Sequence, residues 1–104
     1  MVFEVKMTPV AEKKLDDFLW YLIFVKKSEQ AARNVYTDFL ETKDALAVTA
    51  GSLGFIKESK LKKQGFKRIN FKHHNYFMIF HLDENRAIVD DMFHGLQDYE
   101  NRMR

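Results

Sequence analysis

The spacing of apolar residues changes once along this chain, and that change constrains the fold more than any other feature of the sequence. Between Ala11 and Leu46 the apolar residues recur at the spacing of amphipathic helices. From Phe66 to Phe93 they alternate with polar residues or form short unbroken runs, which is typical of strands. Helices followed by a group of strands predict an α+β fold, with the helices packed on one face of a sheet. The other face is then left available for a partner or substrate.

Local signals set the expected bounds of the first elements. Val2–Met7 alternates apolar and charged residues, so it is predicted to be a strand. Thr8 and Pro9 supply an N-cap residue and a proline at the first helical position, which predicts a helix over about 9–26. Ser28 is suited to cap a second helix that runs to about residue 48. So short a link between the two helices predicts an antiparallel hairpin.

The second half of the chain predicts a three-stranded meander. The expected strands cover 66–72, 76–82 and 87–93, and short polar turns separate them. The tail 96–104 is predicted to form a short helix. The expected architecture is therefore β-α-α-β-β-β, a two-helix hairpin packed on an antiparallel sheet, in a single domain over residues 1–104.

The composition excludes several classes of protein. The chain has no cysteine, so it contains no disulfide framework, no thiolate zinc site and no cysteine nucleophile. Its longest apolar run, Phe18–Val25, is far shorter than the ~20 residues of a membrane span. The first residues lack the basic and apolar regions of a signal peptide. We therefore expect a cytoplasmic protein without a membrane contact.

Charge is distributed unevenly although the formal net charge is only +2. The stretch 57–74 is rich in lysine and contains one acid, Glu58, whereas the stretch 83–100 is acidic and contains one cation, Arg86. Such polarity is either an ordinary solvated surface or a sign of an acidic protein or nucleic acid as partner.

The end of the first predicted helix is apolar on every side. Such a helix is buried on more than one side, by its own core or by a partner. A domain of 104 residues cannot hide every large apolar side chain, and the chain has ten Phe. Trp20 and Phe24 are therefore either part of the core or candidate partner-binding residues.

Four segments together resemble the RelE/ParE superfamily of toxins from bacterial type II toxin–antitoxin systems. Val5–Asp17 is similar to that family's first strand and the following helix with its "A-x-x-x-L" pattern. Gly65–Arg68 resembles its "G-Y-R" segment, whose arginine corresponds to Lys67 or Arg68. Asn75–Glu84 resembles its "N-Y-x-I-F-Y-x-V-D-E" strand, and Phe93–Asn101 resembles its closing "L-H/Y-G-R-R-D-Y-E-N" segment.

The resemblance implies a toxin that a cognate antitoxin neutralises, and it leaves the target open. ParE-like members poison DNA gyrase and need no catalytic residue, whereas RelE-like members cut messenger RNA inside the ribosome. A third possibility is a degenerate, non-toxic binding module. We favour the ParE-like function as the first hypothesis. In this family the antitoxin wraps the toxin, so the expected antitoxin- or target-binding residues are Trp20, Phe24, Lys62, Lys63, Lys67 and Lys72.

The nuclease alternative predicts its own site. Cleavage needs a cation beside the phosphate and a group that moves a proton or stacks on a base. Arg68 with His94 or Tyr99 is the candidate set, and whether the chain is an enzyme stays open. No cofactor and no metal are expected. His73 and His74 point to opposite faces if they lie on a strand, so they do not form a metal pair. Strict alternation separates Asp90 from Asp91 in the same way, and it places His94 on the same face as Asp90.

Overall fold

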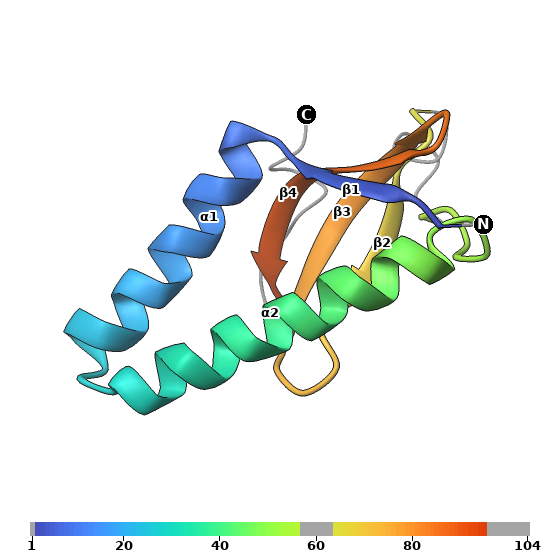
Figure 1. Cartoon of the computed structure of the whole chain (residues 1–104). Helices are drawn as coiled ribbons and strands as arrows, with labels where there is room; N and C mark the ends of the chain where they lie inside the picture. The colour runs from blue at the N-terminus through green and yellow to red at the C-terminus, as the bar shows by residue number, and fades with distance from the viewer. Residues whose placement is uncertain (1, 57–63, 96–104) are drawn as a thin grey trace.

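A computed structural model of the chain describes residues 2–56 and 64–95, in which a helical hairpin packs on a sheet (Figure 1). The elements are β1 (Glu4–Met7), α1 (Pro9–Trp20), η1 (Tyr21–Val25), α2 (Glu29–Thr49), β2 (Lys67–Asn70), β3 (Tyr76–Asp83) and β4 (Arg86–His94). The predicted α+β class and element order are confirmed, with boundaries shifted by a few residues. The short helix predicted over 96–104 lies outside the described residues.

The start of α1 shows how the local sequence sets the first helical turn. Thr8 is extended, and its Oγ1 accepts a hydrogen bond from the backbone N–H of Ala11 at 3.2 Å. Pro9 follows at the first helical position, where no backbone N–H is needed. The same threonine hydroxyl donates to the carbonyl oxygen of Asp90 at 2.9 Å. This N-cap therefore also ties α1 to β4.

Thr8→Ala is expected to lower the free energy of unfolding by about 1–2 kcal/mol, because it removes both the cap and the link to β4. Ser28→Ala is the matched control. The Ser28 hydroxyl caps α2 through one hydrogen bond to the N–H of Ala31, so this change is expected to cost about 1 kcal/mol or less. Urea denaturation of both variants measures the difference. Equal losses would show that the bond to Asp90 contributes nothing.

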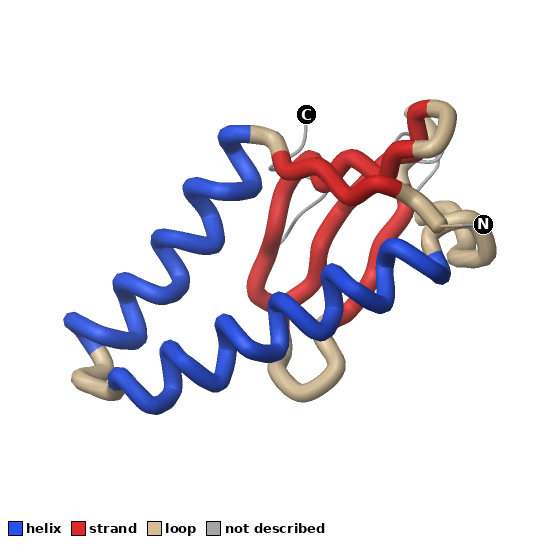
Figure 2. Tube along the Cα trace, in the orientation of Figure 1, coloured by secondary structure: helices blue, strands red, loops and turns tan. Residues whose placement is uncertain are grey.

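The two helices form an antiparallel hairpin whose closed end extends away from the strands (Figures 1 and 2). Lys27 has a φ of 56°, and this left-handed residue makes the sharp turn between the helices. Ser28 caps α2 as predicted. The start of α1 and the end of α2 lie beside the strands, whereas the closed end extends beyond them (Figure 2).

The sheet has the strand order β1-β4-β3-β2. The antiparallel neighbours β2, β3 and β4 form the predicted meander. β1 adds to the free side of β4 in parallel orientation, with Val5 opposite Ala87, so the sheet is mixed instead of antiparallel throughout. Apolar alternation is the same in both orientations, so it could not distinguish them. β1 can run parallel to β4 because a long segment, made of the two helices and the strands β2 and β3, connects them.

The main core lies between the helices and one face of the sheet. Met78, Phe80 and Met92 are fully buried there with Leu46 of α2. The opposite face carries a second cluster of buried residues, made of Ile56, Phe77, Ile79 and Phe93. The apolar part of this face is therefore not available to a partner or substrate, contrary to our expectation. Both faces of β3 are buried, and this is why its sequence is a continuous apolar run instead of a clean alternation.

A β-bulge interrupts the pairing of β3 with β4. Ile79 is opposite Asp91, whereas the next residue, Phe80, is opposite Val89. Asp90 is thus an extra residue without a partner on β3. A bulge of this kind bends the strand and shifts the alternation of side chains after it by one position.

The bulge overturns two expectations that rested on strict alternation. Asp90 and Asp91 both lie on the face opposite the helices, because Asp90 bonds to His81 and Asp91 is the cross-strand partner of Ile79. His94, the partner of Tyr76, lies on the helix side and no longer shares a face with Asp90. The sequence carries no signal for the extra residue.

Candidate functional site

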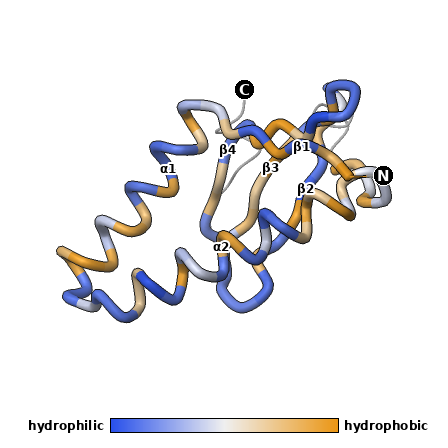
Figure 3. The backbone as a smooth tube through the Cα atoms, in the orientation of Figure 1, coloured by the Kyte–Doolittle hydropathy of each residue, from blue (hydrophilic) through white to orange (hydrophobic). Residues whose placement is uncertain are grey.

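The closed end of the hairpin carries a group of exposed apolar side chains. Figure 3 shows that the chain there includes a hydrophobic segment. No residue of η1 is buried, although all five are apolar. Trp20 and Phe24 are 58% and 52% exposed, and their ring centroids lie 5.3 Å apart. We call Trp20, Tyr21, Phe24 and Val25 the hairpin-end cluster. Contiguous exposed apolar surface of this kind marks binding sites in soluble proteins.

The backbone of η1 is a π-helix, and it shapes how this cluster is presented. The N–H of Lys26 donates to the carbonyl oxygen of Tyr21, five residues earlier, at 3.0 Å. The N–H of Ser28 donates to the carbonyl oxygen of Leu22 at 2.9 Å. Such wide turns are rare and occur frequently at functional sites. The apolar spacing predicted a continuous helix over 9–26. It could not reveal that a backbone hydrogen bond here spans five residues instead of four.

Two cavities flank the closed end of the hairpin. One, of about 300 Å³, is lined by Leu19, Ile23, Glu29, Ala32, Arg33 and Tyr36, so it lies between the two helices. The other, of about 470 Å³, is lined by Phe18, Tyr21, Leu22, Lys26, Tyr76 and His94, and we call it the sheet-side cavity. Both volumes fall in the range of ligand sites in proteins.

The sheet-side cavity combines aromatic walls with hydrogen-bond donors. The rings of Phe18 and Tyr76 lie 4.8 Å apart, and the ring of His94 stands nearly perpendicular to that of Tyr76 at 5.3 Å. Burial raises the pKa of the Tyr76 hydroxyl, and the nearby Tyr21 raises it further. This hydroxyl therefore stays protonated at neutral pH and can donate a hydrogen bond. Among the described residues, no carboxylate lines this cavity.

Arg68 and His94, the predicted nuclease pair, lie on opposite faces of the sheet. The guanidinium carbon of Arg68 is 3.7 Å from the ring centroid of Phe77, which belongs to the cluster on the face away from the helices. His94 lines the sheet-side cavity with Tyr76 on the helix side. The structure therefore does not bring these two side chains together. Tyr99 lies outside the described residues.

The predicted binding lysines differ in their surroundings. Lys67 is only 6% exposed, and its ammonium donates to the carbonyl oxygen of Ala50 at the end of α2 at 3.3 Å. A cation there stabilises the helix, because the last carbonyl groups carry partial negative charge. Lys72 is exposed in the loop between β2 and β3. Lys62 and Lys63 lie outside the described residues.

The bulge also builds a histidine–carboxylate pair that the sequence did not predict. The Nδ1 atom of His81 lies 2.6 Å from Oδ2 of Asp90. Burial raises the pKa of the Asp90 carboxyl, and the nearby charge of Asp91 raises it further. The hydrogen bond to His81 lowers this pKa, but burial has the larger effect, so the pKa lies above its usual value. The ammonium of Lys14 lies 3.1 Å from the Asp91 carboxylate. Only the register of β3 on β4 and the bulge place these groups together.

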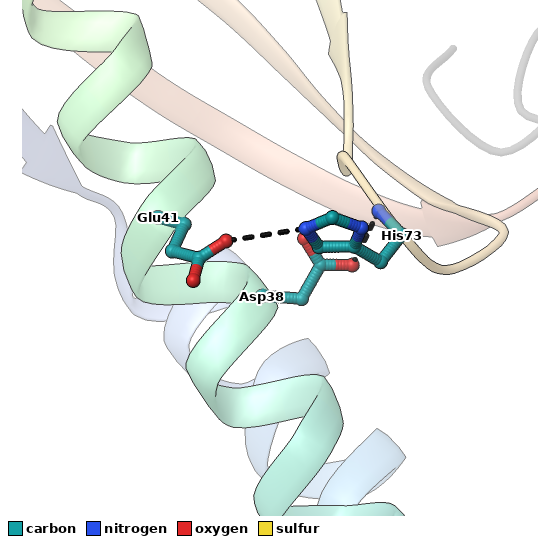
Figure 4. A group of neighbouring side chains, drawn as sticks. All are labelled: Asp38, Glu41 and His73. Atoms are coloured by element: carbon teal, nitrogen blue, oxygen red, sulfur yellow. Dashed lines mark hydrogen bonds and ion pairs between the residues drawn. The ribbon is translucent and has the colours of Figure 1, made fainter.

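Asp38 and Glu41 of α2 and His73 of the β2–β3 loop form a further cluster (Figure 4). Asp38 is 2% exposed, and its carboxylate accepts hydrogen bonds from the backbone N–H groups of Lys72 at 3.1 Å and His73 at 2.9 Å. The Nδ1 atom of His74 lies 2.7 Å from the same carboxylate. The Glu41 carboxylate is 3.3 Å from Nε2 of His73.

This cluster has the donor types of a metal site, but its bonds indicate a structural anchor. Burial alone would raise the pKa of Asp38, yet the hydrogen bonds from His74 and from the backbone of His73 and Lys72 hold it below its usual range. Both carboxylate oxygens already accept hydrogen bonds from the loop, which leaves them poorly placed to bind an ion. We interpret Asp38 as the residue that holds the β2–β3 loop against α2.

Comparison with known proteins identifies the fold. No protein-family model matches the chain, and no curated protein matches it. The structure is similar to a chain from the solved structure described as "Chromosomal ParDE TA system from P. aeruginosa", with a TM-score of 0.70. The match has 14% sequence identity and covers 89% of this chain and 96% of that chain. The ParE-like fold expected from the sequence is thereby confirmed. Within the described residues, no helix is both long and apolar enough to cross a membrane.

Proposed function

We propose that this chain is the toxin of a type II toxin–antitoxin module, a ParE-like growth inhibitor that acts on DNA gyrase in the cytoplasm and is neutralised by a cognate antitoxin. The observation that carries the proposal is the hairpin-end cluster, in which Trp20 and Phe24 are more than half exposed and no residue of η1 is buried. A toxin that inhibits by binding needs such an aromatic surface, since aromatic side chains supply much of the binding energy at protein interfaces.

The placement of the candidate nuclease residues supports the ParE-like assignment over the nuclease branch. A solved structure with a similar fold is described as a ParDE toxin–antitoxin system. The nuclease alternative requires a cation and a proton-transferring group around one phosphate. Arg68 and His94 lie on opposite faces of the sheet, so they do not form that arrangement. A ParE-like inhibitor needs no such group.

The proposal is tested by expressing the chain from an inducible promoter in a bacterium that lacks its antitoxin. Pulses of labelled thymidine and labelled methionine then follow DNA and protein synthesis. We expect thymidine incorporation to fall first, together with induction of the DNA-damage response. An earlier fall in methionine incorporation would instead support ribosome-dependent cleavage of messenger RNA. Unchanged growth and labelling at full expression would support the non-toxic binding module.

A second experiment addresses the target directly. Purified protein is added to DNA gyrase with relaxed plasmid and ATP, and the products are separated on an agarose gel. Inhibition of supercoiling or an increase in linear, gyrase-cleaved plasmid is the expected result. An unaffected gyrase together with growth arrest in cells would contradict gyrase as the target while leaving the toxin assignment intact.

A further inference from the structure

The outer face of α2 carries an exposed apolar pair. α2 packs into the core through one face, on which Val35, Phe39 and Leu46 are buried. On the other side of the helix, Tyr36 and Leu40 are 44% and 41% exposed. Residues four apart are neighbours on a helix surface, so these two side chains form one continuous apolar patch. Packing within the core does not account for this patch.

Opposite charges lie at the two ends of the patch. Arg33 is one turn before Tyr36, and Asp44 is one turn after Leu40. Both are exposed, and spacings of three and four residues keep all four side chains on one face. Arg33 lies 3.5 Å from Glu29, and such an exposed pair is weak. Asp44 has no ion pair among the described residues. We call Arg33, Tyr36, Leu40 and Asp44 the α2 stripe.

The α2 stripe is complementary to a second copy of itself. Its centre is at residues 38–39, and Arg33 and Asp44 lie about 8 Å to either side along the helix axis. When two copies of α2 pair antiparallel around this centre, Arg33 of each copy meets Asp44 of the other. Tyr36 of each copy then packs against Leu40 of the other. A two-fold interface between identical chains requires self-complementarity of this kind.

The charges favour this arrangement over its alternatives. In a parallel pair each residue would meet its own counterpart, so Arg33 would face Arg33 and Asp44 would face Asp44, which is destabilising. In the antiparallel register Lys43 comes opposite Asn34 and meets no like charge. A partner helix with charges of one sign would be repelled at one end of the stripe. A second copy of the chain carries both signs in the required order.

We propose that this chain forms a two-fold symmetric homodimer through the α2 stripe, with two Arg33–Asp44 ion pairs around a centre of Tyr36 and Leu40. One helix from each copy makes a small interface, so the dimer is weak, with a Kd on the order of 10 µM. At about 1 µM the chain is mostly monomeric, and unfolding measured there reports the monomer.

The dimer keeps the hairpin-end cluster accessible. The α2 stripe contains no residue of that cluster, which lies at the closed end, before the start of α2 (Figure 1). Antiparallel pairing of α2 points the two closed ends in opposite directions. One dimer therefore presents two hairpin-end clusters, each open to a target.

Sedimentation equilibrium of the full chain between about 1 and 200 µM tests the proposal, and the mass should rise from monomer to dimer. Arg33→Asp and Asp44→Arg should each weaken the dimer at least about tenfold at low salt, because each places two pairs of like charges in the interface. An equal mixture of these two variants should form the dimer again. A copy of each restores both pairs of opposite charge.

Lys13→Asp is the matched control. Lys13 and Arg33 are both exposed, and each pairs with a carboxylate four residues away on its own helix. Lys13 lies on α1, so its reversal should leave the dimer unchanged. Thermal unfolding checks that every variant is folded.

A chain that stays monomeric at every concentration would overturn the proposal. A dimer that persists in Arg33→Asp, or one that does not return in the mixture of variants, would also overturn it, because either result places the interface elsewhere. Sedimentation measures neither toxicity nor target binding. The outcome is therefore independent of whether the proposed function holds.

Discussion

Replacing Asp38 by asparagine is expected to lower the free energy of unfolding by about 2–3 kcal/mol at neutral pH. The Asp38 carboxylate accepts hydrogen bonds from the N–H groups of Lys72 and His73 and contacts the ring of His74. An asparagine side chain has one acceptor fewer, and its amide group would face an N–H donor in a site that is almost fully buried. Urea denaturation measures the loss.

The pH dependence of this loss has a definite sign. The pKa of Asp38 is lowered in the folded state, so its charge contributes stability above the usual carboxyl pKa of 3.8. That contribution is lost as the pH falls through the lower, folded-state pKa. The difference between wild type and Asp38→Asn should therefore be full at neutral pH and shrink in strong acid. Asp44→Asn is the control, because Asp44 is an exposed carboxylate on the same helix.

An equal loss for Asp38→Asn and Asp44→Asn would contradict the anchoring role of Asp38. A second readout separates local from global effects. Amide hydrogen exchange at residues 71–75 should accelerate in Asp38→Asn more than exchange in β3, because the bonds that are removed hold the loop and not the strand.

Replacing Trp20 and Phe24 together by alanine is expected to abolish growth arrest without unfolding the protein. Aromatic residues at the centre of an interface contribute most of its binding energy, so the double change should weaken target binding about a hundredfold or more. Both side chains are more than half exposed, so the free energy of unfolding should change by about 1 kcal/mol at most. Colony counts under induction and urea denaturation measure the two quantities.

Two control variants sharpen this prediction. Phe55 is 54% exposed, close to the 52% of Phe24, and belongs to the segment after α2, so Phe55→Ala should keep growth arrest. Arg68→Ala should also keep it, because inhibition by binding needs no catalytic cation. Loss of growth arrest in Arg68→Ala, with retention in the double variant, would reverse the proposed function in favour of the nuclease.

The sequence by itself determined the order and nature of the elements. Thr8 and Ser28 mark the helix starts through local hydrogen bonds to the N–H groups of Ala11 and Ala31, and Pro9 does so because its φ already suits the first helical position. The apolar run of β3 predicted a central strand, and the short turns predicted the meander. These features depend on residues close together in the chain, and for this reason they could be predicted from spacing alone.

The tertiary structure alone decided how side chains meet across the fold. The bulge at Asp90 groups His81 with two carboxylates, and the π-turn brings Lys26 beside Tyr21. Each inserts one residue into a regular pattern, and periodicity has no signal for such an insertion. The buried position of Lys67 and the exposure of Trp20 depend on where α2 ends and how far the hairpin extends beyond the sheet. Packing between distant segments sets both, so residue type and spacing could not predict either of them.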